Sequence, residues 1–203
     1  MTVVFDLPDK RPAGLRRPRA VEVTLARVDT TDPPTWSWDG FAQPYHRFDP
    51  VSGSFRVRYA GWTPRTALRE RFPERRIPEG DAHLRLVTLR GRVRMLDLTS
   101  ETVLDALGID DRISTGRLPQ IRTRERPDPF LAACGRLTDL VAGWWDDVHA
   151  IRYRSRTTPS QTNVAFCQHA DLEPDAVPLA AATDVLVTAV IGDGFSVPVS
   201  WLA

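Results

Sequence analysis

The sequence predicts an α+β fold in which a mainly antiparallel sheet is flanked by helices. Segments that alternate apolar and polar residues, as half-buried strands do, occur in both halves of the chain. Segments with apolar residues at helical spacing lie between them. The helices and strands do not alternate regularly, and no internal repeat is present. This order favours an antiparallel sheet over the parallel sheet of repeated βαβ units.

The first predicted elements are two strands. Residues 21–26 alternate apolar and polar side chains, and residues 55–59 do the same after a loop rich in Pro, Asp and Trp. Tyr59 lies on the apolar face of the second strand, at its end. Its ring is therefore expected to point in the same direction as the core.

A helix is predicted directly after the second strand. Thr63 followed by Pro64 is typical of a helix start, because the hydroxyl caps backbone N–H groups and proline suits the first helical position. Leu68 and Phe72 are one turn apart and should anchor the helix to the core. Glu70 projects from the other side, so it is expected to be available to face a cleft.

The middle of the chain combines strands and helices. Residues 83–98 read as paired strands around a turn near Gly91. Ser100 is expected to open a short helix that Gly108 closes. A longer helix begins at Asp128, which is followed by proline and then by apolar residues at helical spacing.

The last third is expected to consist of strands. Residues 151–155 alternate, which places Ser155 on the apolar face and Arg156 on the opposite face. Residues 162–168 form another predicted strand. The C-terminus reads as two strands joined at residues 192–194.

The chain is expected to hold one globular domain. Residues 1–20 mix prolines with basic residues and have no apolar period, so a loosely ordered arm is expected there and a single domain over residues 21–203. A chain of this length buries roughly 70% of its unfolded surface, so its core needs neither disulfide nor metal. The 27 Lys and Arg residues nearly balance the 26 Asp and Glu residues, which excludes DNA binding through a bulk positive field.

Cysteine content and hydropathy point to a cytoplasmic location. Two cysteines are too few for a secreted disulfide framework. The first residues lack the basic and apolar regions of a signal peptide. The longest apolar stretch, at residues 185–191, is far too short to span a bilayer, so no membrane association is expected.

Several common sites are absent from the sequence. No P-loop, no G-x-G-x-x-G turn and no G-x-S-x-G elbow is present. Cys167 and His169 form the only pair with ligand-like spacing, and one pair is weak evidence for zinc. No metal site is expected.

Four residues remain as candidates for chemistry, and each also has a structural explanation. Arg47 could pair with Asp49, and Tyr59 could be a core aromatic residue. Glu70 could be a solvated partner of the neighbouring arginines, and Ser155 could be a hydrogen-bonded hydroxyl at a sheet edge. From pattern alone, these structural explanations are favoured.

The order of these residues nevertheless resembles the RES domain, a family named for its Arg, Glu and Ser. The resemblance covers about residues 22–170 and rests on short segments in the same order as in the family. These segments are Thr-Leu-Ala-Arg at residues 24–27, Tyr-His-Arg-Phe at 45–48, Arg-Tyr-Ala at 58–60, Thr-Pro-Arg-Thr-Ala-Leu-Arg-Glu at 63–70, Leu-Asp-Leu-Thr at 96–99, Ile-Arg-Tyr-Arg-Ser-Arg at 151–156 and Asn-Val-Ala-Phe at 163–166.

The resemblance implies an ADP-ribosyltransferase-like fold and an enzyme that degrades NAD⁺ by phosphorolysis or hydrolysis. Such enzymes include toxins that a cognate antitoxin inhibits, so an Xre-type antitoxin is the implied partner. NAD⁺ is then the substrate, inorganic phosphate is a candidate co-substrate, and no metal is required. Glu70 is the implied catalytic carboxylate, because it can stabilise the positive charge that develops on the ribose.

The other candidates receive binding roles from the same resemblance. Arg47 would hold the pyrophosphate, with Arg27 as a second phosphate contact. The flat face of Tyr59 would support nicotinamide, and Ser155 would hydrogen-bond its ribose or amide. Arg156 is a candidate cation for an acceptor phosphate.

Three departures from the family pattern keep alternatives open. His46 replaces a glycine, residues 48–49 are Phe-Asp where Trp-Asn is expected, and Thr162 stands where glycine is common. One alternative is an ADP-ribosyltransferase that acts on a protein target. The other is a catalytically inactive RES-like module that binds a partner through its arginine-rich arm.

Overall fold

The computed structural model describes residues 5–40, 46–116 and 128–202. Its sheet has six strands in the order β1-β2-β5-β4-β3-β6, and an additional β1–β3 pairing closes five of them into a ring. The pairing of β3 with β4 is parallel and the others are antiparallel. The predicted α+β fold is therefore confirmed. The strands are β1 (Ala20–Asp29), β2 (Arg58–Gly61), β3 (Arg85–Asp97), β4 (Ala150–Arg154), β5 (Thr162–Phe166) and β6 (Leu172–Pro178).

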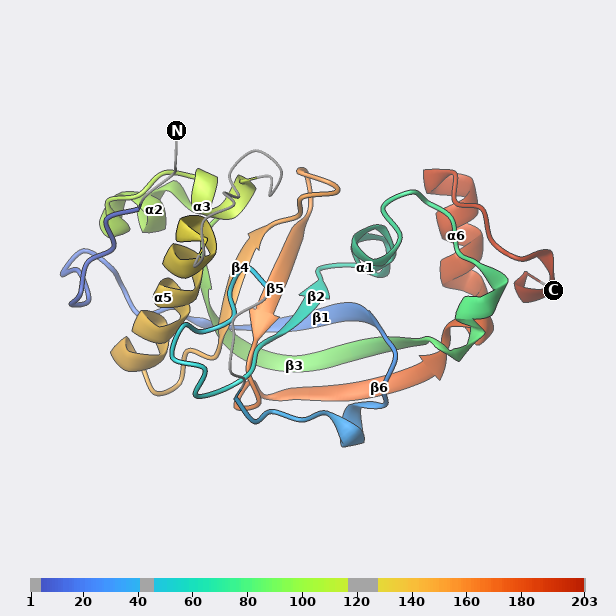
Figure 1. Cartoon of the computed structure of the whole chain (residues 1–203), viewed down its shortest axis with the longest axis horizontal. Coiled ribbons are helices and arrows are strands. Elements are labelled where there is room, and N and C mark those ends of the chain that lie inside the picture. The colour runs from blue at the N-terminus through green and yellow to red at the C-terminus, as the bar shows by residue number, and fades with distance from the viewer. Residues whose placement is uncertain (1–4, 41–45, 117–127, 203) are drawn as a thin grey trace.

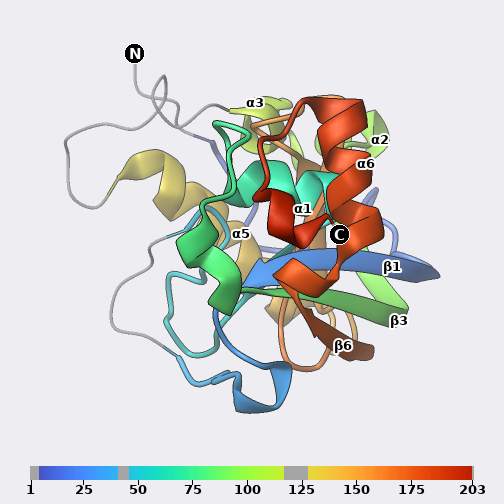
Figure 2. The same cartoon turned by 90° about the vertical axis from the view of Figure 1, so that its right-hand side faces the viewer.

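Helices cover the sheet at two places (Figure 1). At one end α2, α3 and α5 pack over an apolar cluster that includes the buried ring of Phe130. At the other end α1 and α6 pack over a second cluster that contains Leu68 and Leu186 (Figure 2). The helices are α1 (Pro64–Arg71), α2 (Glu101–Leu107), α3 (Arg112–Thr115), α5 (Pro129–Trp144) and α6 (Thr183–Asp193). No helix in the described ranges is long and apolar enough to cross a membrane.

The predicted helix starts are confirmed. The Thr63 side chain caps α1 by accepting a hydrogen bond from the backbone N–H of Thr66. The Asp128 carboxylate caps α5 by accepting from two backbone N–H groups. Gly108 follows α2 with a φ of 67°, the left-handed conformation that glycine adopts without strain. The cap at Thr63 fixes the start of α1, the helix that carries Glu70.

The predicted turn near Gly91 is wrong, because β3 runs without a break through this residue. Gly91 pairs with Val23 of β1 on one side and Leu172 of β6 on the other. A Cβ atom at this position would lie 1.9 Å from the carbonyl oxygen of Asp171. The glycine therefore permits a close approach of two backbones inside the sheet.

The two strands predicted at the C-terminus are also wrong. The apolar run at residues 185–191 lies in α6, which ends at Gly194 with a φ of 67°. A strand that was not predicted, β6, precedes it and pairs with β3 at the edge of the sheet. Its two prolines, Pro174 and Pro178, hide the strand signal, but an edge strand tolerates them.

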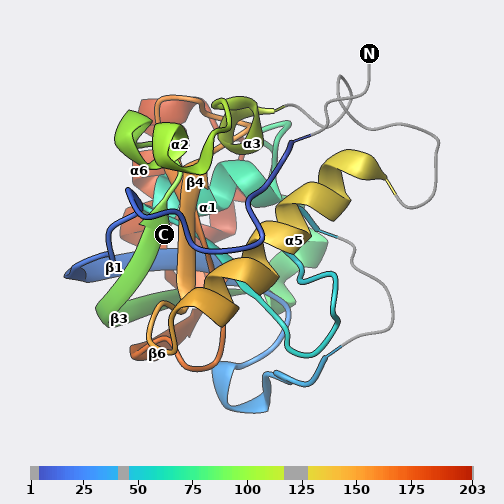
Figure 3. The same ribbon diagram turned by 90° about the vertical axis from the view of Figure 1, so that its left-hand side faces the viewer.

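The N-terminal segment packs on the domain over the part that the structure describes. Phe5, Leu7 and Leu15 are buried and belong to the cluster under α5. Figure 3 shows the segment crossing α5. Arg17 pairs with Asp147 beyond the end of that helix. Residues 5–19 are therefore held against the core rather than forming a loose arm, and residues 1–4 lie outside the described residues.

Candidate functional site

A cleft of about 770 Å³ lies between the sheet and α1. Residues of β1, β2, α1 and the chain around residues 46–49 line it, together with residues at the end of β4. Its charged lining consists of six arginines and two acids. These are Arg27, Arg47, Arg56, Arg58, Arg71 and Arg156, with Asp49 and Glu70. A cleft with this surplus of guanidinium groups suits an anionic ligand.

A second cavity of about 480 Å³ lies beside α5. It is lined by Trp38, Trp145, His149 and Cys167, among others, and by none of the four catalytic candidates. Its lining includes the carboxylates of Asp39 and Asp146 but not that of Glu70. The first cleft is therefore the candidate active site.

Glu70 is anchored by neutral hydrogen-bond donors. Its Oε1 accepts from Ser155 Oγ at 2.6 Å, from Asn163 Nδ2 at 2.9 Å and from Thr157 Oγ1 at 3.2 Å. Within the described ranges, Oε2 has no hydrogen bond and the carboxylate has no ion pair. Because Glu70 lines the cleft, one carboxylate oxygen is fixed and the other can meet a ligand.

Ser155 lies behind Glu70 instead of facing the cleft. β4 ends at Arg154, and the serine is only 2% exposed and is not among the residues that line the cleft. Its Oγ donates to Glu70 and accepts from the backbone N–H of Thr158 at 3.0 Å. The structure thus gives Ser155 a position from which it orients the carboxylate.

Asn163 joins the site although the sequence analysis gave it no role. It lies in β5 between Gly61 and Tyr153 of the neighbouring strands and is 4% exposed. Its Nδ2 holds Glu70, while its buried Oδ1 has no hydrogen-bond partner in the part of the chain that is described. The only signal for it was its place at the start of the segment at residues 163–166.

Arg47 is buried and is held by backbone carbonyl groups. Its guanidinium donates to the carbonyl of Ser114 at 2.5 Å and to that of Gly116. It also lies 5.5 Å from the ring centre of Tyr153 and 5.6 Å from that of Phe130. Burial lowers the pKa of this guanidinium. Arg47 therefore borders the cleft with part of its donor set already used by the protein.

Tyr59 contributes its ring to the cleft while its hydroxyl is engaged behind it. The hydroxyl donates to Asp49 Oδ1 at 2.8 Å and accepts from the backbone N–H of Phe48 at 3.0 Å. Burial and the charge of Asp49 raise the pKa of Tyr59 well above its usual value, so the phenol stays neutral. The ring of His46 lies edge-on to it, with 5.4 Å between the ring centres.

Arg27 and Arg156 both reach the cleft. Arg27 donates to Asp29 at 2.5 Å and to the carbonyl of Tyr59 at 2.8 Å. Burial raises the pKa of Asp29, but the charge and hydrogen bond of Arg27 outweigh it and the net pKa is lowered. Arg156 was expected on the face opposite Ser155, but alternation stops where β4 ends at Arg154. Arg156 therefore lines the same cleft as Glu70.

The structure brings the sequence-predicted residues to one place. Five of the six line the cleft, and the sixth, Ser155, touches Glu70 from behind. In the described residues no three His, Cys, Asp or Glu side chains lie close enough together to hold a metal ion. Cys167 and His169 lie at the second cavity instead.

Comparison with known protein families identifies the family of this chain. The family model of the RES domain matches residues 19–188, which is most of the chain. The chain belongs to the RES domain family. The predicted resemblance is therefore confirmed, and it extends further toward the C-terminus than the segments at residues 22–170.

A solved structure shares the fold of this RES domain. The crystal structure of the toxin–antitoxin complex MbcT–MbcA of M. tuberculosis contains a chain that superposes with a TM-score of 0.57. The alignment covers 85% of this chain and 93% of that chain at 13% sequence identity. This likeness supports the α+β architecture with its mainly antiparallel sheet. A search of curated proteins finds no match to the sequence.

Proposed function

We propose that this RES domain consumes NAD⁺ by cleaving the bond between nicotinamide and ribose. The observation that carries the proposal is the anchored carboxylate of Glu70 in a cleft whose other charged groups are mostly arginines. NAD⁺ has matching polarity, because its pyrophosphate is anionic and its nicotinamide ring is cationic. Membership of the RES family supports the same substrate.

The reaction needs charge stabilisation more than proton transfer. When the C–N bond breaks, its electron pair leaves with the nicotinamide nitrogen, so the leaving group becomes neutral and requires no general acid. Positive charge then develops at the anomeric carbon of the ribose. The carboxylate of Glu70 accepts hydrogen bonds from the ribose hydroxyls, and this interaction strengthens as the charge grows.

The arginines bind the pyrophosphate in this proposal. Arg27 is oriented by Asp29 and by the carbonyl of Tyr59, so its planar fork is held in place before the ligand arrives. Arg47, in the turn at residues 46–49, lines the same cleft and contributes its remaining N–H groups. The ring of Tyr59 supports the nicotinamide and excludes water from one side of the reacting carbon.

Asn163 and Ser155 orient the carboxylate of Glu70 toward the ribose. Both donate to the same oxygen of Glu70, which leaves Oε2 directed to the ribose. The buried Oδ1 of Asn163 can also accept a hydrogen bond from a substrate hydroxyl or amide. Ser155 therefore acts through Glu70 and needs no contact with the substrate.

The acceptor is phosphate or water. With phosphate, an oxygen of HPO₄²⁻ bonds to the anomeric carbon, and the product is ADP-ribose that carries a phosphate on that carbon. With water, the water oxygen bonds to the same carbon, a proton passes to the solvent, and ADP-ribose forms. Arg156, which lines the cleft beside Glu70, is our candidate to bind the acceptor phosphate.

The test is incubation of the purified protein with NAD⁺, with and without phosphate, followed by chromatography to detect nicotinamide and phosphorus NMR to identify the ADP-ribose product. Release of nicotinamide by the wild type and not by Glu70→Gln is expected. A dependence on phosphate would assign phosphorolysis. If a folded sample consumes no NAD⁺, the proposal is wrong and the inactive binding module becomes the better explanation. Radiolabel that appears on protein would instead indicate an ADP-ribosyltransferase.

We also propose that the enzyme is the toxin of a toxin–antitoxin pair. The structural relative was crystallised as such a complex, and the loss of NAD⁺ is harmful to any cell. An Xre-type antitoxin would then cover the cleft. Growth arrest on expression of the wild type, relieved by Glu70→Gln, is the expected result.

A further inference from the structure

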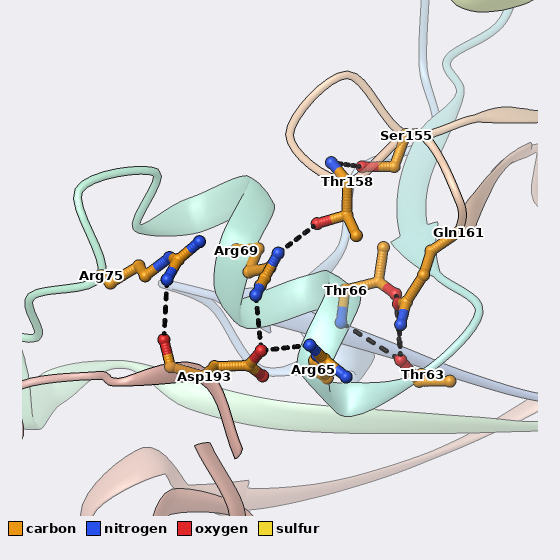
Figure 4. Close-up of polar contacts among 9 residues, drawn as sticks. All are labelled: Thr63, Arg65, Thr66, Arg69, Arg75, Ser155, Thr158, Gln161 and Asp193. Atoms are coloured by element: carbon orange, nitrogen blue, oxygen red, sulfur yellow. Dashed lines mark hydrogen bonds and ion pairs between the residues drawn. The ribbon is translucent and has the colours of Figure 1, made fainter. Parts of the chain in front are cut away.

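A buried carboxylate ties the end of α6 to α1. The side chain of Asp193 is 2% exposed and forms ion pairs with Arg65 and Arg69 (Figure 4). Arg75 donates to the backbone carbonyl of Asp193 at 3.0 Å. Because a buried carboxylate is stable only when it is paired, these contacts hold α1 in one position relative to α6.

Arg69 connects this ion pair to the loop that holds Ser155. Its Nη1 donates to Thr158 Oγ1 at 3.1 Å, while its Nη2 donates to Asp193. The backbone N–H of Thr158 donates to Ser155 Oγ at 3.0 Å, and Ser155 donates to Glu70 at 2.6 Å. A continuous path of hydrogen bonds therefore leads from Asp193 to the carboxylate in the cleft.

Arg65 contacts the same carboxylate without reaching the site. Its side chain is 45% exposed, against 13% for Arg69. In the described part of the chain, Arg65 has no hydrogen bond to the loop at residues 155–161. The two arginines thus share one partner, Asp193, but of the two it is Arg69 that also donates a hydrogen bond to the loop at residues 155–161.

We infer that Asp193 is a positioning residue that holds Glu70 in its working orientation through Arg69, Thr158 and Ser155. The inference rests on the proposed function, because it assigns this path to NAD⁺ cleavage. Asp193 lies beyond residues 19–188, so the family match does not include it. The C-terminal segment of this chain is therefore part of the apparatus that orders the active site.

Loss of the Asp193 charge would act on the loop. Arg65 and Arg69 would repel each other without their counter-ion, and the guanidinium of Arg69 would move toward water. Thr158 Oγ1 would then lose the hydrogen bond from Arg69, and the Ser155 side chain would hold Glu70 in a wider range of orientations. Because the arginines that bind the substrate are untouched, kcat should fall and KM should not change.

The kinetic test compares Asp193→Asn with Arg65→Gln. Asp193→Asn should lower kcat about tenfold with little change in KM for NAD⁺, whereas Arg65→Gln should keep the kcat of the wild type. Thr158→Val cuts the path without touching the buried ion pair and should lower kcat on its own. In the Thr158→Val background, Asp193→Asn should cause no further loss, because both changes break one path. Equal losses in both backgrounds would overturn the inference.

A second measurement separates this inference from the proposed function. Amide hydrogen exchange at Thr158 and Gln161 should be faster in Asp193→Asn than in the wild type and unchanged in Arg65→Gln. Unaltered exchange in folded Asp193→Asn would overturn the path. If the wild type consumed no NAD⁺, the proposed reaction would fail, and the exchange data would still decide whether Asp193 orders the loop.

Discussion

The acidic and basic parts of the cleft hold their charges in opposite ways. Glu70 is fixed by the uncharged donors Ser155, Thr157 and Asn163. Arg27 is fixed by the carboxylate of Asp29. The carboxylate thus keeps its charge uncompensated by its immediate partners, whereas the arginine is already partly neutralised.

This difference indicates a division of labour. An uncompensated carboxylate interacts strongly with positive charge that appears only in the transition state, so it serves the chemical step. A guanidinium that a carboxylate orients binds an anion in the ground state and in the transition state alike, so it serves affinity. The changes below test that division, in order of decreasing effect.

Glu70→Gln should have the largest effect. The amide keeps the size of the side chain but removes the charge, so kcat for NAD⁺ should fall by about a thousandfold. The dissociation constant of NAD⁺ should change little, as calorimetry can show. Glu74→Gln, the same change at an exposed glutamate of the following loop, is the matched control and should leave both quantities unaltered.

Arg27→Gln should mainly raise KM for NAD⁺ rather than lower kcat. Loss of a charged hydrogen bond to phosphate should raise KM about tenfold, while kcat falls much less. The wild-type KM should also rise with salt, and this dependence should weaken in the variant. Arg90→Gln, at an arginine that is 61% exposed, provides the control. A fall in kcat with unchanged KM would contradict the division of labour.

Tyr59→Phe should lower stability more than binding. The change removes the hydroxyl that donates to Asp49 Oδ1 and accepts from the backbone N–H of Phe48, so the free energy of unfolding should fall by about 1–2 kcal/mol. The ring remains in the cleft, so KM should stay close to that of the wild type. Chemical denaturation measures the free energy of unfolding, and steady-state kinetics measure KM. An unchanged denaturation midpoint would show that the two hydrogen bonds of the Tyr59 hydroxyl do not stabilise the fold.

Asp29→Asn should change the pH dependence of stability, which is the smallest effect. The pKa of Asp29 is lowered in the folded protein, so the carboxylate stabilises the fold above its unfolded pKa of about 4 and loses this contribution as the pH falls through the folded value. Unfolding between about pH 6 and pH 2 should therefore show a shallower acid slope in the variant. If the free energy of unfolding fell equally steeply with pH in the wild type and in the variant, Asp29 would not be stabilised by Arg27.

The sequence predicted what depends on local patterns. The caps at Thr63 and Asp128 fixed two helices correctly, because a cap involves only neighbouring residues. Gly91 was misread as a turn, since its reason is a contact with Asp171 that only the folded sheet reveals. The apolar run at residues 185–191 fits a strand or a helix equally well by composition, and its packing on the cluster under α1 decides for the helix.

The site was predictable as a set of residues but not as an arrangement. Alternation placed Ser155 on the apolar face and Arg156 on the opposite face, but β4 ends at Arg154 and the rule stops there. The loop then turns Ser155 behind Glu70. Asn163 and Asp193 were missed because nothing in their local sequence indicates that they meet α1.

The most direct test of the different roles of Glu70 and Arg27 is a crystal structure of the Glu70→Gln variant with NAD⁺ bound. The account predicts the pyrophosphate within hydrogen-bond distance of Arg27 and the hydroxyls of the nicotinamide ribose beside residue 70. A dinucleotide bound in the reverse direction, or in the second cavity next to Trp145, would contradict it.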